Sequence, residues 1–486
     1  MKDPTILIVE FGSQFTPLIE RSFRELGYRS AVLPPKRAEA WIRSKDPKAI
    51  ILSGSRHSVN SEDAPTINQS VFENGTPILG ICYGMQLIAK ALGGSVVSVS
   101  SNSEYGPARV KITQSALFRN LPEETDVWSS HRDTVQTVPD GFCVTATAPD
   151  GAIAAMEDLS RQIWGVQFHP EVNDTVLGKK ILGNFASAAG CEKDWHPADI
   201  VSGLQSRMRG ELSDGRVAIA FSGGTDSTTL AALLSPVVGA RLRAFCIDGG
   251  QLRKGELEVI KANADSANVE LEVIHAEADF LAAFDIVHTQ APDPELKRRI
   301  FRQTYQSCLT RRLCAWNAAH FIQGTLAPDM IESGQTGGDV IKTHHNIGVM
   351  VKGCTSYHPF AHLFKYEVRA LARELELPES VINRQPFPGP GLFIRIKNGW
   401  PNSERLDILR WADHEVTRIV KKAGIYEDVS QLVVGLPCGL SVGVKGDERA
   451  YAYEIVVRGV KTIDFMTAEG YQFPADVRRE ISKILF

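Results

Sequence analysis

The segment FSGGTDSTTL, Phe221–Leu230, follows the apolar run 217–220 and opens a helix. Gly223 and Gly224 let backbone amides crowd around an anion, and a helix N-terminus favours negative charge at that place. The segment lacks the lysine of the G-x-x-x-x-G-K-[ST] loop, which reaches the terminal phosphates of a nucleotide. The order of strand, glycine loop and helix therefore predicts an α/β fold with an anion-binding loop of another kind.

The side chains of this loop suit pyrophosphate as a leaving group. Three hydroxyl groups add hydrogen-bond donors, and Asp226 can hold the Mg²⁺ that accompanies the phosphates. The alternative is an ordinary Ser-Gly-Gly turn with helix-capping side chains. The loop resembles the SGGxDS loop of the ATP pyrophosphatase family, which splits ATP between its α- and β-phosphates and transfers AMP to a substrate oxygen. The resemblance implies ATP contacts by Ser222, Gly223, Gly224, Thr225, Asp226, Ser227 and Thr228.

Outward from this loop, apolar runs alternate with helical ones in both directions, which predicts parallel sheets covered on both faces. Before it, the runs 108–113, 141–148 and 162–171 predict further strands that pair antiparallel. The pattern breaks around Gly190–Pro197, and the Pro- and Gly-rich stretch 383–396 marks a second boundary or a binding loop. We expect three α/β domains: 1–192, 193–387 and a small one at 388–486.

Composition is that of an ordinary globular protein. The chain has 486 residues, 43% hydrophobic and 23% charged, with a net charge of −4. Such a balance provides no basic field for nucleic acid, and no apolar run reaches the length of a membrane span. The eight cysteines are scattered, without C-x-x-C pairs or zinc spacing. We therefore expect a cytoplasmic protein with reduced thiols and no nucleic-acid or membrane partner.

A candidate nucleophile lies in LGICYGMQL, Leu79–Leu87. Cys82 stands between an apolar strand and a helix in the pattern G-x-C-x-G, a nucleophile elbow with sulfur in place of oxygen. The helix N-terminus favours the thiolate. The backbone N–H of Tyr83, with a second donor from Gly54, would face a developing oxyanion.

A candidate base follows another strand. In WGVQFHPE, Trp164–Glu171, we predict a strand to Phe168 and then His169. Alternation in an extended segment would put Glu171 on the same side as His169, where it could hold the imidazole tautomer that accepts the thiol proton. A lone cysteine or histidine is more often a core side chain. Four other cysteines lack such surroundings and are predicted to lie in the core: Cys143, Cys246, Cys308 and Cys314.

The motifs GICYGMQ and GVQFHPE resemble those of class I glutamine amidotransferases, and the similarity runs to about residue 190. In that family the cysteine attacks the side-chain amide of glutamine and forms a thioester, with release of ammonia. The resemblance implies a triad of Cys82, His169 and Glu171.

Four further motifs follow in order: 246–256, 323–334, 341–346 and 384–392. With the first half, the set resembles the glutamine-hydrolysing GMP synthase family over nearly the whole chain. The resemblance implies glutamine, ATP with Mg²⁺ and a xanthosine-monophosphate-like nucleotide as ligands, and a homodimer. It also implies three groups of residues: Asp248, Gly249 and Gly324 near adenosine; Lys342, His344 and His345 as a lid; and Pro388, Gly389 and Gly391 facing the phosphate of the nucleotide substrate.

The chain departs from this family's pattern in places. It ends at ISKILF, without the Lys-Pro-Pro and Ile-Glu-Trp-Glu motifs, so we expect a shortened C-terminal domain. Arg56, Arg132 and Val349 also replace residues usual in the family. Two alternatives therefore stay open: the same half-reactions on another oxo-purine or deazapurine, and a nucleotide-binding paralogue without turnover. The near-neutral charge counts against a tRNA-thiolating enzyme.

Overall fold

The structure, a computed structural model, describes residues 5–98, 104–113, 115–327, 329, 351, 353–445, 448–462 and 469–485. The chain divides into two compact units, Met1–Asp199 and Ile200–Phe486. The domain limits expected after residues 192 and 387 remain predictions. In the described part of the chain, no helix is both long enough and apolar enough to cross a bilayer.

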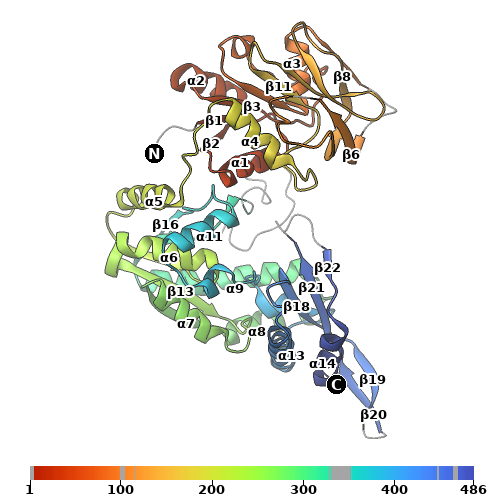
Figure 1. The fold of residues 1–486 in the computed structure, drawn as a ribbon. Helices are drawn as coiled ribbons and strands as arrows, with labels where there is room; N and C mark the ends of the chain where they lie inside the picture. Colours follow the sequence, from red (N-terminus) through yellow and green to blue (C-terminus); the bar gives the residue numbers. More distant parts are fainter. Residues whose placement is uncertain are drawn as a thin grey trace. The chain divides into compact units, whose positions relative to one another are not determined.

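The described part of the first unit contains a nine-stranded sheet whose first five strands are parallel and whose other four are antiparallel (Figure 1). Its spatial order is β2 (Ser30–Leu33), β1 (Ile6–Val9), β3 (Ala49–Leu52), β4 (Ile78–Ile81), β11 (Ile163–Val166), β10 (Ile153–Asp158), β9 (Cys143–Thr147), β6 (Glu104–Ile112) and β7 (Glu124–His131). A separate antiparallel pair is formed by β5 (Ser95–Ser98) and β8 (Asp133–Thr137). The mixed sheet predicted from the apolar runs is therefore confirmed.

Helices cover both faces of the parallel strands. Ile19 and Phe23 of α1 (Thr16–Glu25) pack in one core with Phe185 of α4 (Gly178–Ala188). The opposite core receives α2 (Pro35–Lys45) and α3 (Tyr83–Ala91). Alternate residues of each strand enter the two cores, which is why the strands are apolar throughout.

The helix α3 packs unusually close to the sheet. A Cβ on Gly80 would lie 2.5 Å from the carbonyl carbon of Gly84, and a Cβ on Gly84 would lie 2.2 Å from the oxygen of Leu52. Backbone atoms cannot yield at such distances. The two glycines of the G-x-C-x-G motif are thus required by packing and set the sharp turn between β4 and α3.

Substituting alanine for Gly84 should destabilise the first unit by about 3 kcal/mol, because the added methyl group overpacks rigid backbone. The measurement is the midpoint of urea unfolding followed by tryptophan fluorescence. Gly183→Ala, in α4, is the matched control, because its Cβ would meet Leu26 at an ordinary distance of 3.8 Å. Alanine is favoured over glycine within a helix, so the free energy of unfolding should stay level or rise by about 0.5–1 kcal/mol. Equal effects of the two substitutions would contradict the packing argument.

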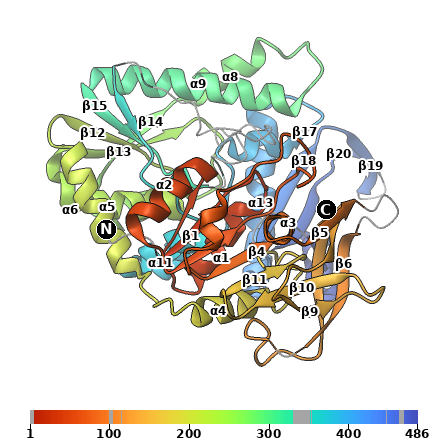
Figure 2. The same cartoon turned by 90° about the horizontal axis from the view of Figure 1, so that it is seen from above.

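The second unit is built on an all-parallel sheet of five described strands. Their order is β14 (Glu270–His275), β13 (Leu242–Asp248), β12 (Arg216–Ala220), β15 (Ala318–Ile322) and β16 (Thr355–Tyr357). One face is covered by α8 (Glu277–Asp285) and α9 (Pro294–Ala315), whose aromatic side chains join the core; in Figure 2 both helices lie on one side of the strands. The other helices include α5 (Pro197–Glu211), α6 (Thr225–Val238), α7 (Glu256–Ser266) and α11 (Lys365–Glu374).

The last hundred residues share this core. The ring of Phe393 packs against Phe280 and Phe284 of α8, with centroids 5.8 and 5.0 Å away. The segment adds α12 (Glu379–Ile382), η3 (Gly391–Arg395) and α13 (Ser403–Lys422), then a sheet of β17 (Ile396–Lys397), β18 (Gln431–Pro437), β21 (Val456–Lys461) and β22 (Glu469–Tyr471), a hairpin of β19 (Leu440–Lys445) and β20 (Glu448–Tyr453), and α14 (Ala475–Leu485).

The core placement of the cysteines is only half right. Cys246 and Cys308 are buried, as predicted, but Cys143 and Cys314 are exposed. Cys143 begins β9, where the first two residues face solvent, and Cys314 lies at the solvent side of the last turn of α9. Local apolar context did not reveal which face each residue occupies.

Candidate active sites

Cys82 lies between β4 and α3 with φ 53° and ψ −105°, a conformation that residues with a side chain rarely adopt. The turn places Cys82 at the carboxyl end of β4 and directly before α3, the position that the elbow pattern predicts for it. The residue is only 5% exposed, and its Sγ donates to the backbone oxygen of Ser130 at 3.7 Å. The thiol is therefore held in one position at the carboxyl edge of the parallel strands.

The structure brings His169 and Glu171 together, with Nδ1 of the imidazole 2.7 Å from Oε1 of the carboxylate and both side chains buried. The reason differs from the predicted one. The strand ends at Val166, so residues 169–171 form a turn and not an extended run. The turn is held by backbone contacts: the N–H of His169 donates to Trp128 O at 2.9 Å, and Thr175 Oγ1 donates to His169 O at 2.6 Å.

The pKa of His169 reflects three influences. Burial lowers the pKa, but the charge of Glu171 and the interaction with Cys82 raise it by a larger amount. The pKa of His169 is therefore raised to about 10. The charged imidazolium form of His169 is thus favoured beside Cys82 and Glu171. Since folding raises the pKa of His169, protonation of its imidazole stabilises the folded protein. This contribution to folding stability is complete below the ordinary histidine pKa and is lost as the pH rises through about 10.

The variant Glu171→Gln should lower glutamine hydrolysis by about 10³-fold, because the amide neither fixes the tautomer nor stabilises the imidazolium. The alkaline limb of the pH–rate profile should also move to lower pH, since the largest influence that raises the pKa of His169 is removed. Rates of glutamate release measured across pH check both effects. An unshifted alkaline limb would show that Glu171 does not set the charge of His169.

The roles of the two proposed oxyanion donors remain predictions, and the structure shows where each residue lies. Tyr83 is the first residue of α3, so its backbone N–H has no carbonyl partner within the helix. Gly54 lies beside the imidazole: a Cβ there would be 3.3 Å from Cε1 of His169. The edge of the imidazole also packs on Phe15, at a centroid distance of 4.9 Å. No signal in the sequence pointed to Phe15.

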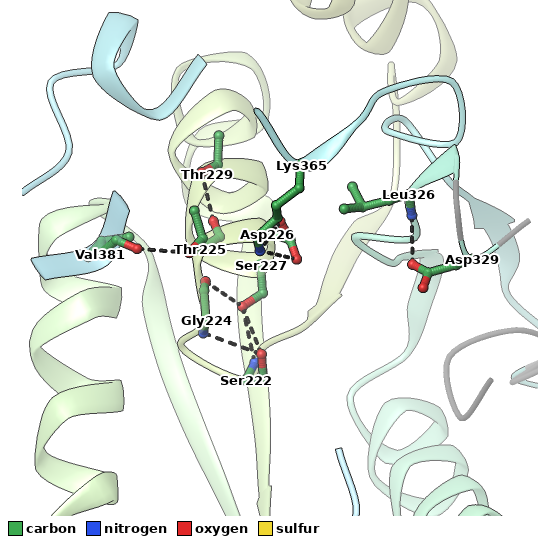
Figure 3. Close-up of polar contacts among 10 residues, drawn as sticks. All are labelled: Ser222, Gly224, Thr225, Asp226, Ser227, Thr229, Leu326, Asp329, Lys365 and Val381. Carbon is green, nitrogen blue, oxygen red and sulfur yellow. Dashed lines mark hydrogen bonds and ion pairs between the residues drawn. The ribbon is translucent and has the colours of Figure 1, made fainter. Parts of the chain in front are cut away.

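In the second unit, several hydrogen bonds hold the predicted phosphate loop, Ser222–Thr228 (Figure 3). Gly223 has φ 66°, Ser222 Oγ lies 3.2 Å from Ser227 Oγ, and the N–H of Gly224 contacts Ser222 Oγ at 3.3 Å. Thr225 Oγ1 donates to the backbone oxygen of Val381 at 2.8 Å, so this hydroxyl supports the loop. Thr228 is fully buried, and its hydroxyl has no hydrogen-bond partner among the described residues.

The loop has a lysine after all, supplied from another element. Nζ of Lys365, the first residue of α11, lies 2.8 Å from both carboxylate oxygens of Asp226 (Figure 3). The side chains are 32% and 29% exposed, so the pair sits at the surface of the loop. Lys365 was not predicted from the sequence, because it lies 139 residues beyond Asp226 in the chain.

The remaining predicted residues lie at the same edge or outside the described part. Asp248 ends β13, and a Cβ on Gly324 would lie 3.4 Å from Asp226, so Gly324 adjoins the loop. The predicted phosphate turn is closed by a bond from Gly391 N to Pro388 O at 2.8 Å, with Gly389 between them. The three lid candidates lie outside the described residues: Lys342, His344 and His345.

The loop fits Mg²⁺ in the manner usual for nucleotide sites. Among the described residues, no group of three or more acidic, histidine or cysteine side chains could enclose a metal ion. Mg²⁺ commonly takes one or two carboxylates and completes its shell with phosphates and water. Asp226 offers one carboxylate at the anion loop, and Lys365 would have to share it with the ion.

These features define a class of protein: a class I glutamine amidotransferase unit and an ATP-pyrophosphatase-like unit in one chain. The family model for glutamine amidotransferase class-I matches residues 7–189. The asparagine synthase family model matches residues 204–293, and the model for the GMP synthase C terminal domain matches residues 418–486.

Whole-length relatives specify the family. The GMP synthase [glutamine-hydrolyzing] of Aquifex aeolicus is 40% identical, over 100% of this chain and 96% of that protein. Those of Thermobifida fusca and Thermus thermophilus are 42% and 41% identical, each over 98% of this chain and over 92% and 94% of the relative. The chain belongs to the glutamine-hydrolysing GMP synthase family.

Proposed function

We propose that this protein converts xanthosine monophosphate to GMP with glutamine as nitrogen donor and ATP as activating cosubstrate. The observation that carries the proposal is the similarity of about 40% identity to GMP synthases along the entire chain. It is supported by the contact between His169 and Glu171 beside Cys82 and by the anion loop at Ser222–Thr228.

In the first unit, the Cys82 thiolate attacks the side-chain amide of glutamine. The oxyanion that forms would be stabilised by the N–H groups of Tyr83 and Gly54. The His169 imidazolium then donates its proton to the leaving nitrogen, so that ammonia departs and a thioester remains. Water cleaves the thioester, with His169 as base, and releases glutamate.

In the second unit, the C2 oxygen of xanthosine monophosphate attacks the α-phosphorus of ATP, and pyrophosphate leaves. Amides of the glycine loop and Lys365 would take up the charge that accumulates on pyrophosphate. Mg²⁺, bound with ATP at Asp226, would neutralise part of the same charge. Ammonia then adds at C2, and the C2–O bond to AMP breaks to leave GMP. No γ-phosphoryl transfer is involved, so the lysine of the more familiar loop is unnecessary.

The test is a direct product assay. The protein with ATP, Mg²⁺, glutamine and xanthosine monophosphate should yield GMP, AMP, pyrophosphate and glutamate in equal amounts, and ammonium should replace glutamine. Parallel reactions use inosine monophosphate and deazapurine nucleotides as acceptors. If one of these nucleotides reacts faster than xanthosine monophosphate, that nucleotide is the substrate. Absence of AMP with every acceptor would reject the ligase assignment.

We further propose a homodimer formed through the β19–β20 hairpin. Val442 and Tyr451 are directly paired across the hairpin and are 54% and 60% exposed, and Leu440, two residues along β19, is 58% exposed. Three large apolar side chains on one exposed hairpin face are typical of an interface. Val442→Glu should convert a dimer to a monomer in light-scattering chromatography, whereas Leu159→Glu, at an exposed leucine of the first unit, should not.

A further inference from the structure

The backbone oxygen of Gly223, inside the phosphate loop, accepts two side-chain hydrogen bonds. Arg384 Nη1 donates at 2.7 Å, and Asn263 Nδ2 donates at 2.8 Å. A Cβ on Gly223 would lie 2.8 Å from a side-chain carbon of Ile260, so the loop is pressed against α7 at this residue. The carbonyl group is therefore fixed in direction by two donors and by packing.

Fixing this carbonyl also fixes a donor for phosphate. In a trans peptide the C=O of one residue and the N–H of the next point in opposite directions. Anchoring the oxygen of Gly223 therefore turns the N–H of Gly224 away from Arg384 and toward the hydroxyl side of the loop, where its contact to Ser222 Oγ is a long 3.3 Å. This N–H donates to Ser222 Oγ, on the side of the loop where we place the ATP phosphates.

Arg384 belongs to the chain segment that carries the other proposed site. It lies two residues before the turn Pro386–Gly391, which we assign to the phosphate of the nucleotide substrate. Its Nη2 forms an ion pair with Glu256, the first residue of α7, and the two side chains are only 17% and 9% exposed. The next residue, Gln385, is buried and bonds instead to the backbone of Val429 and Leu432.

Hydrogen bonds on both sides of the turn Pro386–Gly391 join it to the loops proposed to bind ATP. Before it, Val381 O accepts from Thr225 Oγ1 of the phosphate loop at 2.8 Å. After it, the N–H of Leu392 donates to Gln251 O at 2.9 Å, and Oε1 of Gln251 accepts from the N–H of Gly249 at 2.8 Å. We therefore expect a shift of the turn on binding a nucleotide phosphate to move the loops that follow β12 and β13, because these hydrogen bonds join them.

We propose that Arg384 is a positioning residue that couples the two nucleotide sites of the second unit. When the acceptor nucleotide seats the turn Pro386–Gly391, Arg384 holds the Gly223 carbonyl so that the Gly224 N–H meets the phosphates of ATP. The acceptor thus tightens ATP binding, and ATP is activated chiefly when an acceptor oxygen is present. The proposal rests on the proposed function, because it needs both ligands.

Asn263 distinguishes coupling from simple support of the loop. It bonds the same carbonyl oxygen but comes from α7, and within the described part of the chain it has no hydrogen bond to the turn. If Arg384 only supports the loop, Arg384→Gln and Asn263→Ala should behave alike. If Arg384 couples the sites, only its replacement should remove the effect of the acceptor on ATP affinity.

The experiment measures the Kd of α,β-methylene-ATP with Mg²⁺ by calorimetry, with and without saturating xanthosine monophosphate. In the unaltered protein the acceptor should lower this Kd by about tenfold, within the range usual for coupled sites. In Arg384→Gln the ratio of the two Kd values should fall to near one. In Asn263→Ala both Kd values should rise while the tenfold ratio is kept.

Two further variants protect the test against misfolding. Arg384→Gln leaves Glu256 as a buried, uncompensated carboxylate, so the double variant with Glu256→Gln removes that charge and should show the same loss of the ratio. Glu256→Gln alone should keep it. The inference is overturned if Arg384→Gln keeps the ratio, if Asn263→Ala also loses it, or if the unaltered protein shows none. If the protein makes GMP but the acceptor does not change the Kd of the ATP analogue, this inference alone is contradicted. If the protein makes no GMP, the proposed function is contradicted.

Discussion

Cys82→Ala should abolish GMP formation from glutamine, with a loss of about 10⁴-fold or more, and leave the ammonium-driven rate unchanged. In the proposed mechanism the sulfur atom of Cys82 attacks the amide, and the thiol interacts with the imidazole of His169, which contacts Glu171. Ammonium enters the reaction after that step and does not need the thiol. The measurement is GMP formation with each nitrogen donor at saturating ATP and acceptor.

The matched control is Cys143→Ala, which removes an exposed thiol from the same unit and should alter neither rate. The partial variant Cys82→Ser should behave like alanine in the glutamine reaction, because a hydroxyl is not deprotonated by the neighbouring imidazole to a comparable degree. Survival of the glutamine-driven rate in Cys82→Ala would remove Cys82 as the nucleophile. Equal loss of both rates would instead show that the substitution disturbs the synthetase unit.

Asp226→Ala should stop AMP formation with both nitrogen donors, lowering it by about 10³-fold, the scale expected when one electrostatic group of an active site is lost. The substitution removes the carboxylate proposed for Mg²⁺ and also leaves Lys365 without the partner it contacts at 2.8 Å. Release of AMP and pyrophosphate from ATP, with ammonium as donor, measures the loss.

Two controls separate a local from a global effect. Asp265→Ala, an exposed carboxylate of α7, should leave AMP formation unchanged. Labelling of Cys82 by a diazoketone analogue of glutamine should proceed in Asp226→Ala as in the unaltered protein, since the first unit is not altered. An AMP rate in Asp226→Ala close to that of the unaltered protein would remove the pyrophosphatase assignment from this loop.

Some parts of both sites were readable from short stretches of chain. The elbow glycines Gly80 and Gly84 and the loop glycine Gly223 stand where contacts of under 3 Å exclude a side chain. Such requirements are local in origin, because they arise where a strand turns directly into a helix. The parallel sheets were predictable for a similar reason: strands buried on both faces must be apolar at every position.

Other parts were predicted for a reason that the structure does not support. The pairing of His169 with Glu171 was expected from alternation along an extended strand, but β11 ends at Val166 and a turn makes the contact. The burial of Cys143 and Cys314 was wrong, because a local apolar context does not tell which face of an element meets the core.

Short-range patterns in the chain were enough to specify the α/β architecture, the order of the two sites and the backbone conformations at Cys82 and Gly223, since each depends on neighbours within a few residues. Folding alone brought Lys365 to Asp226 and Arg384 to Gly223, across 139 and 161 residues. Parallel strands end at a common edge, so segments remote in the chain converge there, and which side chains meet depends on the packing of helices behind the sheet. Local sequence patterns do not specify that packing. The positions of Lys365 and Arg384 beside the loop of the second unit are therefore seen only in the folded chain.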